Sequence, residues 1–598
     1  MSTHAARLAA LREQLARQSL DGFVVPLTDE HMSEYVGAYA QRLGWLTGFE
    51  GSAGTAVVLS AEAAIFTDGR YTLQVREQVS PDHWAYVPVP QTSVAEWLAE
   101  HAPDGARIGY DPWLHTRAWV EEAARALADR GATLVAVSTN PVDAVWNDRP
   151  APSTAPLTAY PDALAGRSSA DKRHEIAGWL AERRADAVVL SALDSIAWAL
   201  NIRGLDVEST PVALSYAIVH ADATADFYVD AAKLGDEVRR HLGNAVRVHD
   251  RLAFAPALAG LAGKRVVADP ERAVAAIFDA LDAGGATIVA QREPVVLAKA
   301  IKNVAEVAGH EAAQLRDAGA MIRFLKWIEA AGSAGTETEL TAAAKLRAFR
   351  EETGELRDLS FSTISATGPH GAIPHYRVTE ESSLPIERGQ LFLIDSGGQY
   401  LDGTTDITRV VPIGEPTAEM RDRFTRVLKG HIAIATAMFP EGTTGGQIDG
   451  FARRPLWEAG LDFPHGTGHG IGAYLAVHEG PQRIAAPNYP GGGPAEPLRA
   501  GMMLSNEPGY YKAGEYGIRI ENLILVEPRE IAGADRAMLG FRTLTFVPIE
   551  RDLIAADLLT EAERAWVDAY HAEVLDRVGP TLDVEHRAWL AAKCAPLA

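Results

Sequence analysis

The stretch of sequence that decides the fold is Gly389-Gln-Leu-Phe-Leu-Ile-Asp-Ser-Gly-Gly-Gln-Tyr-Leu-Asp-Gly-Thr-Thr-Asp-Ile-Thr-Arg409. An apolar strand pattern, Leu391–Ile394, ends in Asp395, and a second strand pattern that begins at Thr404 carries Asp406. Glycines at 397, 398 and 403 supply a turn between them, so a hairpin would bring the two carboxylates side by side. Burying acids in this way costs several kcal/mol per ion, and a bound cation would offset that cost.

The same pattern recurs downstream, between Gly501 and Asn522. Glu507 ends one apolar run, Gly509 and Gly514 are expected in the turn, and Glu521 is expected on the returning strand. Strand alternation then places Arg519 and Glu521 on one face, with Ile518 and Ile520 on the other. The sequence therefore predicts a second hairpin that carries acids.

A glycine-rich stretch with two histidines, Pro464–Gly472, lies between the two predicted hairpins, and it carries His465 and His469, with His478 following soon after. Each acid or histidine alone has an ordinary explanation, such as a strand end, a helix cap or a loop. Together, four carboxylates and one imidazole form a hard, oxygen-rich ligand set that suits Mn²⁺, with Zn²⁺ or Co²⁺ as alternatives. So many negative ligands favour two ions over one, and paired ions can activate water and polarise a carbonyl.

Composition and charge exclude several other classes of protein. The 598 residues include 79 Asp and Glu against 56 Lys and Arg, a net charge of −23, which argues against nucleic-acid binding and against membrane-surface binding. There is no HExxH motif, phosphate-binding loop, GxSxG or GxGxxG. The one cysteine, Cys594, cannot form an internal disulfide or a thiolate zinc site, and we expect it to be a free thiol in a loose tail.

The first residues do not resemble a signal peptide. Leu8, Leu11 and Leu15 fall on one helical face, arginines alternate with them, and no long apolar core is present. The sequence therefore predicts a cytoplasmic location.

The chain is expected to form three domains, at residues 1–152, 153–303 and 304–598. Four prolines between residues 149 and 161 mark a linker, and beyond it the opening pattern recurs. A strand is predicted at Ala187–Leu190, as at Gly22–Val25; Trp198 corresponds to Trp45, and Phe227-Tyr-Val-Asp230 corresponds to Phe66-Thr-Asp68. The first two domains are thus interpreted as copies of one α/β unit, with both tryptophans in the core. The third begins with a helix whose apolar stripe comprises Val304, Val307, Leu315, Ile322 and Leu325.

These motifs resemble those of the pita-bread metallopeptidases, and within that family the aminopeptidase P (Xaa-Pro aminopeptidase) group of the long, three-domain cytosolic type. The resemblance covers essentially the whole chain. It is carried by the segments Trp45–Gly54, Thr67–Tyr71, Lys299–Asn303, Gly371–Tyr376, Asp395–Arg409, His465–Gly472, His478–Pro481, Glu507–Asn522 and Leu544–Glu550, and by Tyr570-His571. The chain departs from the family pattern at several places, among them His370 where Asn is common, Pro374 where an aliphatic residue is usual, and Gly398 where Ala is usual.

The resemblance implies two creatinase-N-terminal-like α/β domains followed by a pita-bread catalytic domain of α+β type. It makes Asp395, Asp406, His469, Glu507 and Glu521 the ligands of two metal ions, usually manganese, with Asp406 and Glu521 bridging both. It also implies that the protein is a homodimer.

The resemblance further implies release of the first residue from peptides with proline second. The candidate catalytic residues are His375, His465 and His478, which match family histidines that position substrate and assist proton transfer, together with Glu507 and Arg519. Glu507 is our candidate for handling the proton of the nucleophile.

Three alternatives remain at this point. A prolidase would cleave Xaa-Pro dipeptides by the same chemistry, although two additional domains and the long tail favour the aminopeptidase. A creatinase-like hydrolase would share the fold without metal, and the five-ligand set argues against it. A non-catalytic peptide- or histone-binding module would have lost ligands, and none is missing from this sequence.

Overall fold

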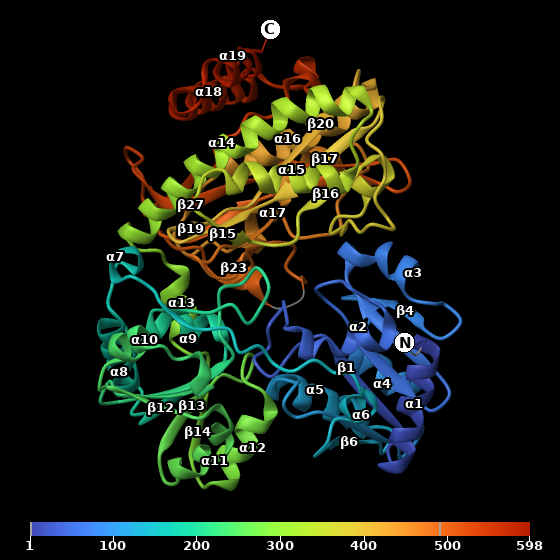
Figure 1. The fold of residues 1–598 in the computed structure, drawn as a ribbon, viewed down its shortest axis with the longest axis vertical. Helices are drawn as coiled ribbons and strands as arrows, with labels where there is room; N and C mark the ends of the chain where they lie inside the picture. The colour runs from blue at the N-terminus through green and yellow to red at the C-terminus, as the bar shows by residue number, and fades with distance from the viewer. Residues whose placement is uncertain (1–2, 490–491, 598) are drawn as a thin grey trace. The chain divides into compact units, whose positions relative to one another are not determined.

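The computed structural model describes residues 3–489 and 492–597, and the chain divides into two compact units, Met1–Lys299 and Ala300–Ala598. Within the described residues, no helix is both long and apolar enough to cross a membrane. Figure 1 shows the elements of each unit along the chain.

The first unit contains two six-stranded sheets. The first sheet has the order β4-β3-β2-β1-β5-β6. Its strands are β1 (Gly22–Pro26), β2 (Thr55–Leu59), β3 (Ala63–Thr67), β4 (Ala85–Pro88), β5 (Arg107–Tyr110) and β6 (Thr133–Ala136). The second sheet has the order β12-β11-β10-β8-β13-β14. Its strands are β8 (Ala187–Leu190), β10 (Ser215–His220), β11 (Ala225–Val229), β12 (Val246–His249), β13 (Arg265–Ala268) and β14 (Thr287–Ala290).

The two sheets repeat each other strand by strand. In each, a central strand pairs antiparallel with a second, which pairs antiparallel with a third, and the remaining pairings are parallel. The corresponding acids Asp68 and Asp230 both follow the third strand, and both side chains accept a backbone N–H two residues later. The predicted repeat of one α/β unit is therefore confirmed.

Helices cover these sheets because their apolar faces pack against the strands. Leu8, Leu11 and Leu15, which share one face of α1, are buried in the first core. Trp198 is buried, at 5% exposed. Trp45 is only partly buried and stacks on Trp146 with ring centroids 5.4 Å apart. The helices are α1 (His4–Arg17), α2 (Arg42–Thr47), α3 (Gln74–Gln78), α4 (Val94–His101), α5 (Arg117–Ala128), α6 (Pro141–Val145), α7 (Asp162–Ala165), α8 (Ser169–Glu182), α9 (Leu193–Leu200), α10 (Asp236–Leu242), α11 (Phe254–Leu258), α12 (Ala275–Ala283) and α13 (Val295–Ala300). A short pair, β7 (Thr158–Ala159) and β9 (Ile202–Arg203), completes the strands of this unit.

The second unit is built on antiparallel sheets. A three-stranded sheet has the order β16-β17-β20, and a six-stranded sheet has the order β21-β28-β27-β24-β22-β23. Their strands are β16 (Ile364–Thr367), β17 (Leu391–Ser396), β20 (Ile407–Pro412), β21 (Met438–Pro440), β22 (Gly468–Gly470), β23 (Glu479–Ile484), β24 (Met503–Asn506), β27 (Asn522–Arg529) and β28 (Met538–Thr543). Two smaller sheets comprise β15 (Leu356–Leu359), β18 (Gly398–Tyr400) and β19 (Gly403–Thr404), and β25 (Gly509–Lys512) with β26 (Tyr516–Arg519).

Helices of the second unit lie over these sheets (Figure 1). They are α14 (Val304–Ala334), α15 (Glu339–Glu351), α16 (Ala418–Ala435), α17 (Gly445–Trp457), α18 (Glu561–Val578) and α19 (Val584–Lys593). The predicted stripe on α14 is confirmed only at its last two positions, Ile322 and Leu325, which are buried. Val307 and Leu315 are partly buried, and Val304 is 88% exposed because it begins the helix.

The C-terminal region is docked rather than loose. Helices α18 and α19 contact α14, and Cys594, which caps α19, is 7% exposed. The expectation of a loose tail is therefore wrong, while Cys594 is a free thiol as expected, and burial raises its pKa to about 12.

Candidate metal centre

Two pairs of antiparallel strands set the positions of the four carboxylates. Strand β17 pairs with β20 so that Asp395 lies opposite Thr408, and Asp406 directly precedes β20. Strand β24 pairs with β27 through Asn506 and Asn522. Because Glu507 directly follows β24 and Glu521 directly precedes β27, the strand ends present both acids on the same side of the pairing.

The predicted hairpins are wrong in one respect, because neither is a simple turn. The segment after β17 holds the β18–β19 ladder, and the segment after β24 holds the β25–β26 ladder. Gly509 therefore begins a strand instead of sitting in the turn, while Gly514 has the expected positive φ of 77°. Glu521 lies between two strands rather than within one.

Asp406, His469 and Glu521 form the centre of the cluster. One ligand atom from each lies within 4.8 Å of the others, and all three side chains are buried. Nε2 of His469 lies 3.5 Å from Oδ2 of Asp406 and 3.4 Å from Oε1 of Glu507. Nδ1 of His469 lies 3.0 Å from the carbonyl of Gly470, which can only accept, so Nδ1 donates and the lone pair of Nε2 faces the carboxylates.

Burial and mutual repulsion disfavour the ionised form of the carboxylates in this cluster. Burial, together with the neighbouring acids, holds the pKa values of Asp406 and Glu521 well above the usual range, and burial raises the pKa of Glu507 as well. Oδ1 of Asp395 is buried and has no hydrogen-bond partner among the described residues. A cluster of this kind is suited to cations.

Arg519 links Asp395 to two further side chains that sequence reasoning missed. Its Nη2 pairs with Oδ2 of Asp395 at 2.5 Å, its Nη1 donates to the Tyr511 hydroxyl at 2.6 Å, and its Nε donates to Oγ1 of Thr408 at 3.1 Å. Thr408 in turn donates to Oε2 of Glu521 at 2.7 Å. Thr408 is two positions from Asp406, and Tyr511 is diagonal to Arg519 across β25–β26, so both contacts depend on a strand register that the structure supplies.

His465 joins this network through Tyr511. Nε2 of His465 lies 2.7 Å from the Tyr511 hydroxyl, and its Nδ1 lies 2.8 Å from the carbonyl of Gly466. Nδ1 therefore donates to the carbonyl, so Tyr511 donates to Nε2. Burial raises the pKa of Tyr511, which keeps this proton on the hydroxyl.

The other two predicted histidines lie beside His469. The rings of His469 and His478 are 4.3 Å apart in an edge-to-face arrangement, and the rings of His478 and His375 are 6.4 Å apart. His478 thus lies beside the ligand candidate His469, and His375 lies beside His478.

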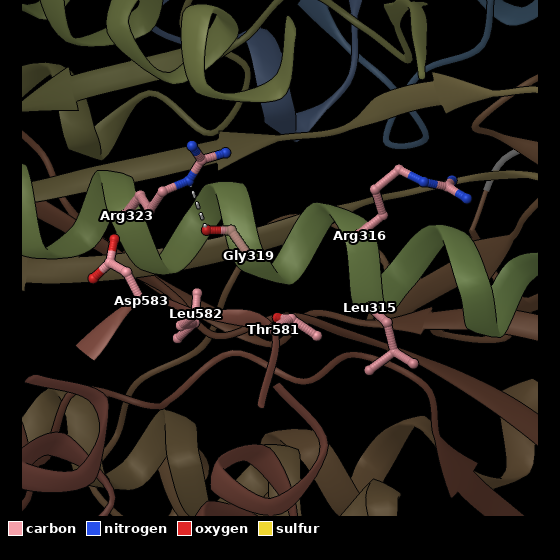
Figure 2. A pocket seen from close by; sticks show the side chains of 7 residues that line it. All are labelled: Leu315, Arg316, Gly319, Arg323, Thr581, Leu582 and Asp583. Carbon is pink, nitrogen blue, oxygen red and sulfur yellow. Dashed lines mark hydrogen bonds between the residues drawn. The ribbon is translucent and has the colours of Figure 1, made fainter. Parts of the chain in front are cut away.

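A separate cavity of about 400 Å³ lies between α14 and the segment Thr581–Asp583 (Figure 2). Its arginines are already engaged: Arg316 pairs with both oxygens of Asp402, and Arg323 pairs with Glu352. None of the predicted site residues lines this cavity.

The comparisons with known proteins agree with this geometry. Residues 308–528 match the model of metallopeptidase family M24, and residues 537–597 match the C-terminal region of that family. Two copies of the creatinase/prolidase N-terminal domain match residues 7–145 and 148–306. The chain is 41% identical to the "Probable Xaa-Pro aminopeptidase P" of Laccaria bicolor, over 99% of this chain and 93% of that protein. The chain belongs to metallopeptidase family M24.

Other relatives of this M24 peptidase extend over its full length. Aminopeptidase P2 of Arabidopsis thaliana is 39% identical over 97% of the chain and 86% of its own length. The crystal structure of an X-prolyl aminopeptidase from Caenorhabditis elegans, described as a cytosolic enzyme with a di-nuclear active site, matches with a TM-score of 0.95 and 35% identity, covering both chains completely. The resemblance and the fold class predicted from the sequence, two creatinase-like domains before a pita-bread domain, are confirmed.

Proposed function

We propose that this M24 peptidase is a Xaa-Pro aminopeptidase, which releases the first residue from peptides with proline in the second position. The observation that carries the proposal is the convergence of Asp406, His469 and Glu521 within 4.8 Å, in a chain similar throughout its length to proteins named Xaa-Pro aminopeptidase.

The same site is proposed to hold two divalent ions, with Asp395, Asp406, His469, Glu507 and Glu521 as ligands. Raised carboxylate pKa values, the unpartnered oxygen of Asp395 and the inward lone pair of His469 all fit cations at this place. The similar Caenorhabditis elegans enzyme is described as di-nuclear, which supports two ions. When bound, such ions activate water and polarise the scissile carbonyl.

The protein's own residues supply the remaining steps. Glu507 is proposed to accept the proton of the attacking water, because its carboxylate lies 3.4 Å from Nε2 of His469 in the ligand cluster. His478, whose ring lies edge-to-face with that of His469, and His375, which lies beside His478, are proposed to hold the substrate and to stabilise charge that develops on the carbonyl oxygen. Arg519 fixes Asp395 and, through Tyr511, His465.

Four finer points also remain proposals. Manganese is the proposed metal, because an oxygen-rich set with one imidazole suits it. The domains are proposed to span residues 1–152, 153–303 and 304–598. A cytoplasmic location is supported by the neighbour described as cytosolic. A homodimer is supported by two aromatic side chains on α17 that are exposed in the single chain, Phe451 at 47% and Trp457 at 52%.

The proposal is tested by incubating purified protein, with manganese and after chelation, with the peptides Arg-Pro-Pro and Arg-Ala-Pro. We expect release of arginine from Arg-Pro-Pro alone, loss of that activity on chelation, and its return when manganese is added. Metal analysis should find two ions per chain. Cleavage of Arg-Ala-Pro at the same rate, or full activity without metal, would contradict the proposal.

Two further measurements address the alternatives. A prolidase would cleave a Xaa-Pro dipeptide faster than Arg-Pro-Pro, whereas an aminopeptidase should show the opposite order. Light scattering of the wild type and of a Trp457→Ser variant tests the dimer, and the variant is expected to have the mass of one chain.

A further inference from the structure

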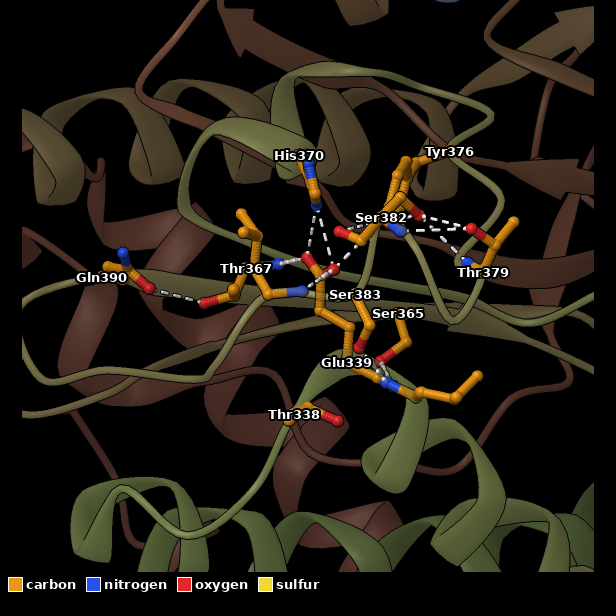
Figure 3. Close-up of polar contacts among 12 residues, drawn as sticks. Thr338, Glu339, Ser365, Thr367, His370, Tyr376, Thr379, Ser382, Ser383 and Gln390 are labelled. Atoms are coloured by element: carbon orange, nitrogen blue, oxygen red, sulfur yellow. Dashed lines mark hydrogen bonds and ion pairs between the residues drawn. The ribbon is translucent and has the colours of Figure 1, made fainter.

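A second buried carboxylate, Glu339, lies outside the proposed metal centre. It is the first residue of α15 and is fully buried. Its side chain accepts hydrogen bonds from the backbone N–H of Thr367 at 2.7 Å and of Leu384 at 2.9 Å, from Nδ1 of His370 at 2.9 Å and from the Tyr376 hydroxyl at 3.0 Å (Figure 3). Four donors on one buried carboxylate form a strong, charge-assisted arrangement.

These contacts close a loop at its base. Thr367 ends β16, and Leu384 lies seventeen positions later, so Glu339 binds both ends of the intervening segment. The backbone of Glu339 adds two contacts there: its N–H donates to the carbonyl of Leu384 at 3.0 Å, and its carbonyl accepts from the Ser365 hydroxyl at 2.7 Å. The loop Gly368–Ser383 is therefore anchored on one residue.

The same carboxylate also holds two side chains of this loop, that of His370, five positions before His375, and that of Tyr376, directly after it. The rings of His370 and Tyr376 stack with centroids 4.3 Å apart. Oγ of Ser382 lies 2.9 Å from the Tyr376 hydroxyl, and because that hydroxyl gives its one hydrogen to Glu339, Ser382 is the donor in this contact. Because a carboxylate only accepts, Nδ1 of His370 must be the donor in its contact.

The opposite side of the loop packs tightly on β26. A Cβ added to Gly371 would lie 2.9 Å from the backbone nitrogen of Gly517, and one added to Gly517 would lie 1.6 Å from the carbonyl oxygen of Gly371. Strand β26 ends at Arg519, the residue that pairs with Asp395. The loop is thus held between Glu339 and the wall of the proposed site, and His375 projects from it next to His478.

We infer that Glu339 is a positioning residue for His375. It binds both ends of the loop and the side chains of His370 and Tyr376, and so fixes where the His375 imidazole meets a bound peptide. The inference rests on the proposed function. The hydrogen bonds of Glu339 described above go to residues of this loop and its ends and to none of the proposed metal ligands, so its effect is expected in the handling of peptide and not in the binding of metal.

The test is a double-mutant cycle of Glu339→Gln and His375→Ala, measured as kcat/KM on Arg-Pro-Pro. The glutamine variant keeps the side-chain shape but replaces an acceptor oxygen with a donor amide and removes the charge. We expect Glu339→Gln alone to lower kcat/KM about 10- to 100-fold, the range for partners that orient an active-site group. In the His375→Ala background the same change should cost less than about threefold, because the group being positioned is already absent.

Three further measurements keep the result interpretable. The affinity for Mn²⁺, measured by calorimetry, should stay within about twofold of wild type in Glu339→Gln. Binding of the product Pro-Pro to all four proteins repeats the cycle if His375→Ala leaves too little turnover. Tyr376→Phe removes a single donor and should give a smaller loss of the same kind, should Glu339→Gln fail to fold. The control is Glu550→Gln, another buried carboxylate that pairs with Lys593 away from this loop.

An equal cost of Glu339→Gln in both backgrounds, or a loss of Mn²⁺ affinity above about tenfold, would overturn the inference, as would a control variant with the same loss of kcat/KM. Wild-type protein that fails to cleave Arg-Pro-Pro would overturn the proposed function and this inference with it. An active wild type with an additive cycle would overturn the inference alone.

Discussion

Replacing Asp406 with Asn should make the metal-free protein more stable, although it should destroy the proposed metal site. Asp406 is 3% exposed, and an oxygen of Glu521 lies within 4.8 Å of one of its own. When both acids are ionised, at a pH above their folded-state pKa values, two like charges at that distance repel by about 3 kcal/mol at an effective dielectric constant of about 20. Asn keeps the shape and removes this repulsion, but it also loses attraction to Arg519 and His478. We therefore expect a net gain of about 1–2 kcal/mol in the free energy of unfolding.

Manganese should reverse this order. An ion at about 100 times its dissociation constant stabilises the folded state by about 2.7 kcal/mol per site, and Asp406 is proposed to bridge both sites. The wild type should gain this energy, and Asp406→Asn should lose most of it. Urea unfolding followed by tryptophan fluorescence, with and without manganese, measures all four values.

The reasoning would be refuted by a metal-free Asp406→Asn that is less stable than metal-free wild type, or by a variant that keeps the full gain from manganese. Asp402→Asn is the matched control, because Asp402 lies in the same turn segment but pairs with Arg316. It should lose stability modestly and keep the manganese gain.

The pH dependence of the metal-free protein follows from the same cluster. The folded-state pKa values of Asp406 and Glu521 are raised, so the folded state binds protons more tightly than the unfolded state. Stability is therefore fully present below the ordinary carboxyl range and falls as the pH rises through the folded-state values. The slope should be smaller in Asp406→Asn, because one of the two groups has been removed.

Three other changes test the fold. Burial raises the pKa of Glu293 from 4.5 to about 7. The free energy of unfolding of the first unit should therefore fall by about 3 kcal/mol between pH 4.5 and 7, and Glu293→Gln should remove that pH dependence in urea titrations. Asp317 pairs with both Nε and Nη2 of the buried Arg350, so Asp317→Asn should cost about 3–5 kcal/mol in equilibrium unfolding. The buried Tyr570 hydroxyl donates to the backbone and accepts from Arg409, and Tyr570→Phe should cost about 1–3 kcal/mol in the same assay.

Much of the fold could be predicted from the sequence, because local patterns and a repeat carry it. The strands at Gly22–Val25 and Ala187–Leu190 are short apolar runs, and they form where predicted. The burial of the first residue of α14 could not be predicted in this way. Val304 fits the helical stripe, but an apolar residue at the first position of a helix has no neighbouring turn to cover it.

The candidate ligands of the site could be predicted from the sequence, but the hydrogen bonds that join them to other side chains could not. Acids at the ends of apolar strands stand out because burying them is costly, and this pointed to Asp395, Asp406, Glu507 and Glu521. Tyr511 and Thr408 have no such signal, because a tyrosine or a threonine in a strand is ordinary. Their roles depend on strand register, which the inserted ladders change and which no local pattern fixes.

The charges around the cluster explain why two ions suit the site better than one. Four carboxylates face one buried guanidinium, that of Arg519, while the hydrogen bond of His469 to the carbonyl of Gly470 leaves its Nε2 as a neutral ligand. With all four acids ionised, the set has three negative charges in excess, and a single divalent ion would still leave one. A second ion turns the balance to one positive charge, which favours negative charge that develops on a carbonyl oxygen. A protein with a net charge of −23 can in this way present a locally positive centre to its substrate. A variant that lacks one carboxylate should therefore lose more affinity for the second ion than for the first. Titration of Asp395→Asn with manganese should then reveal a single remaining site.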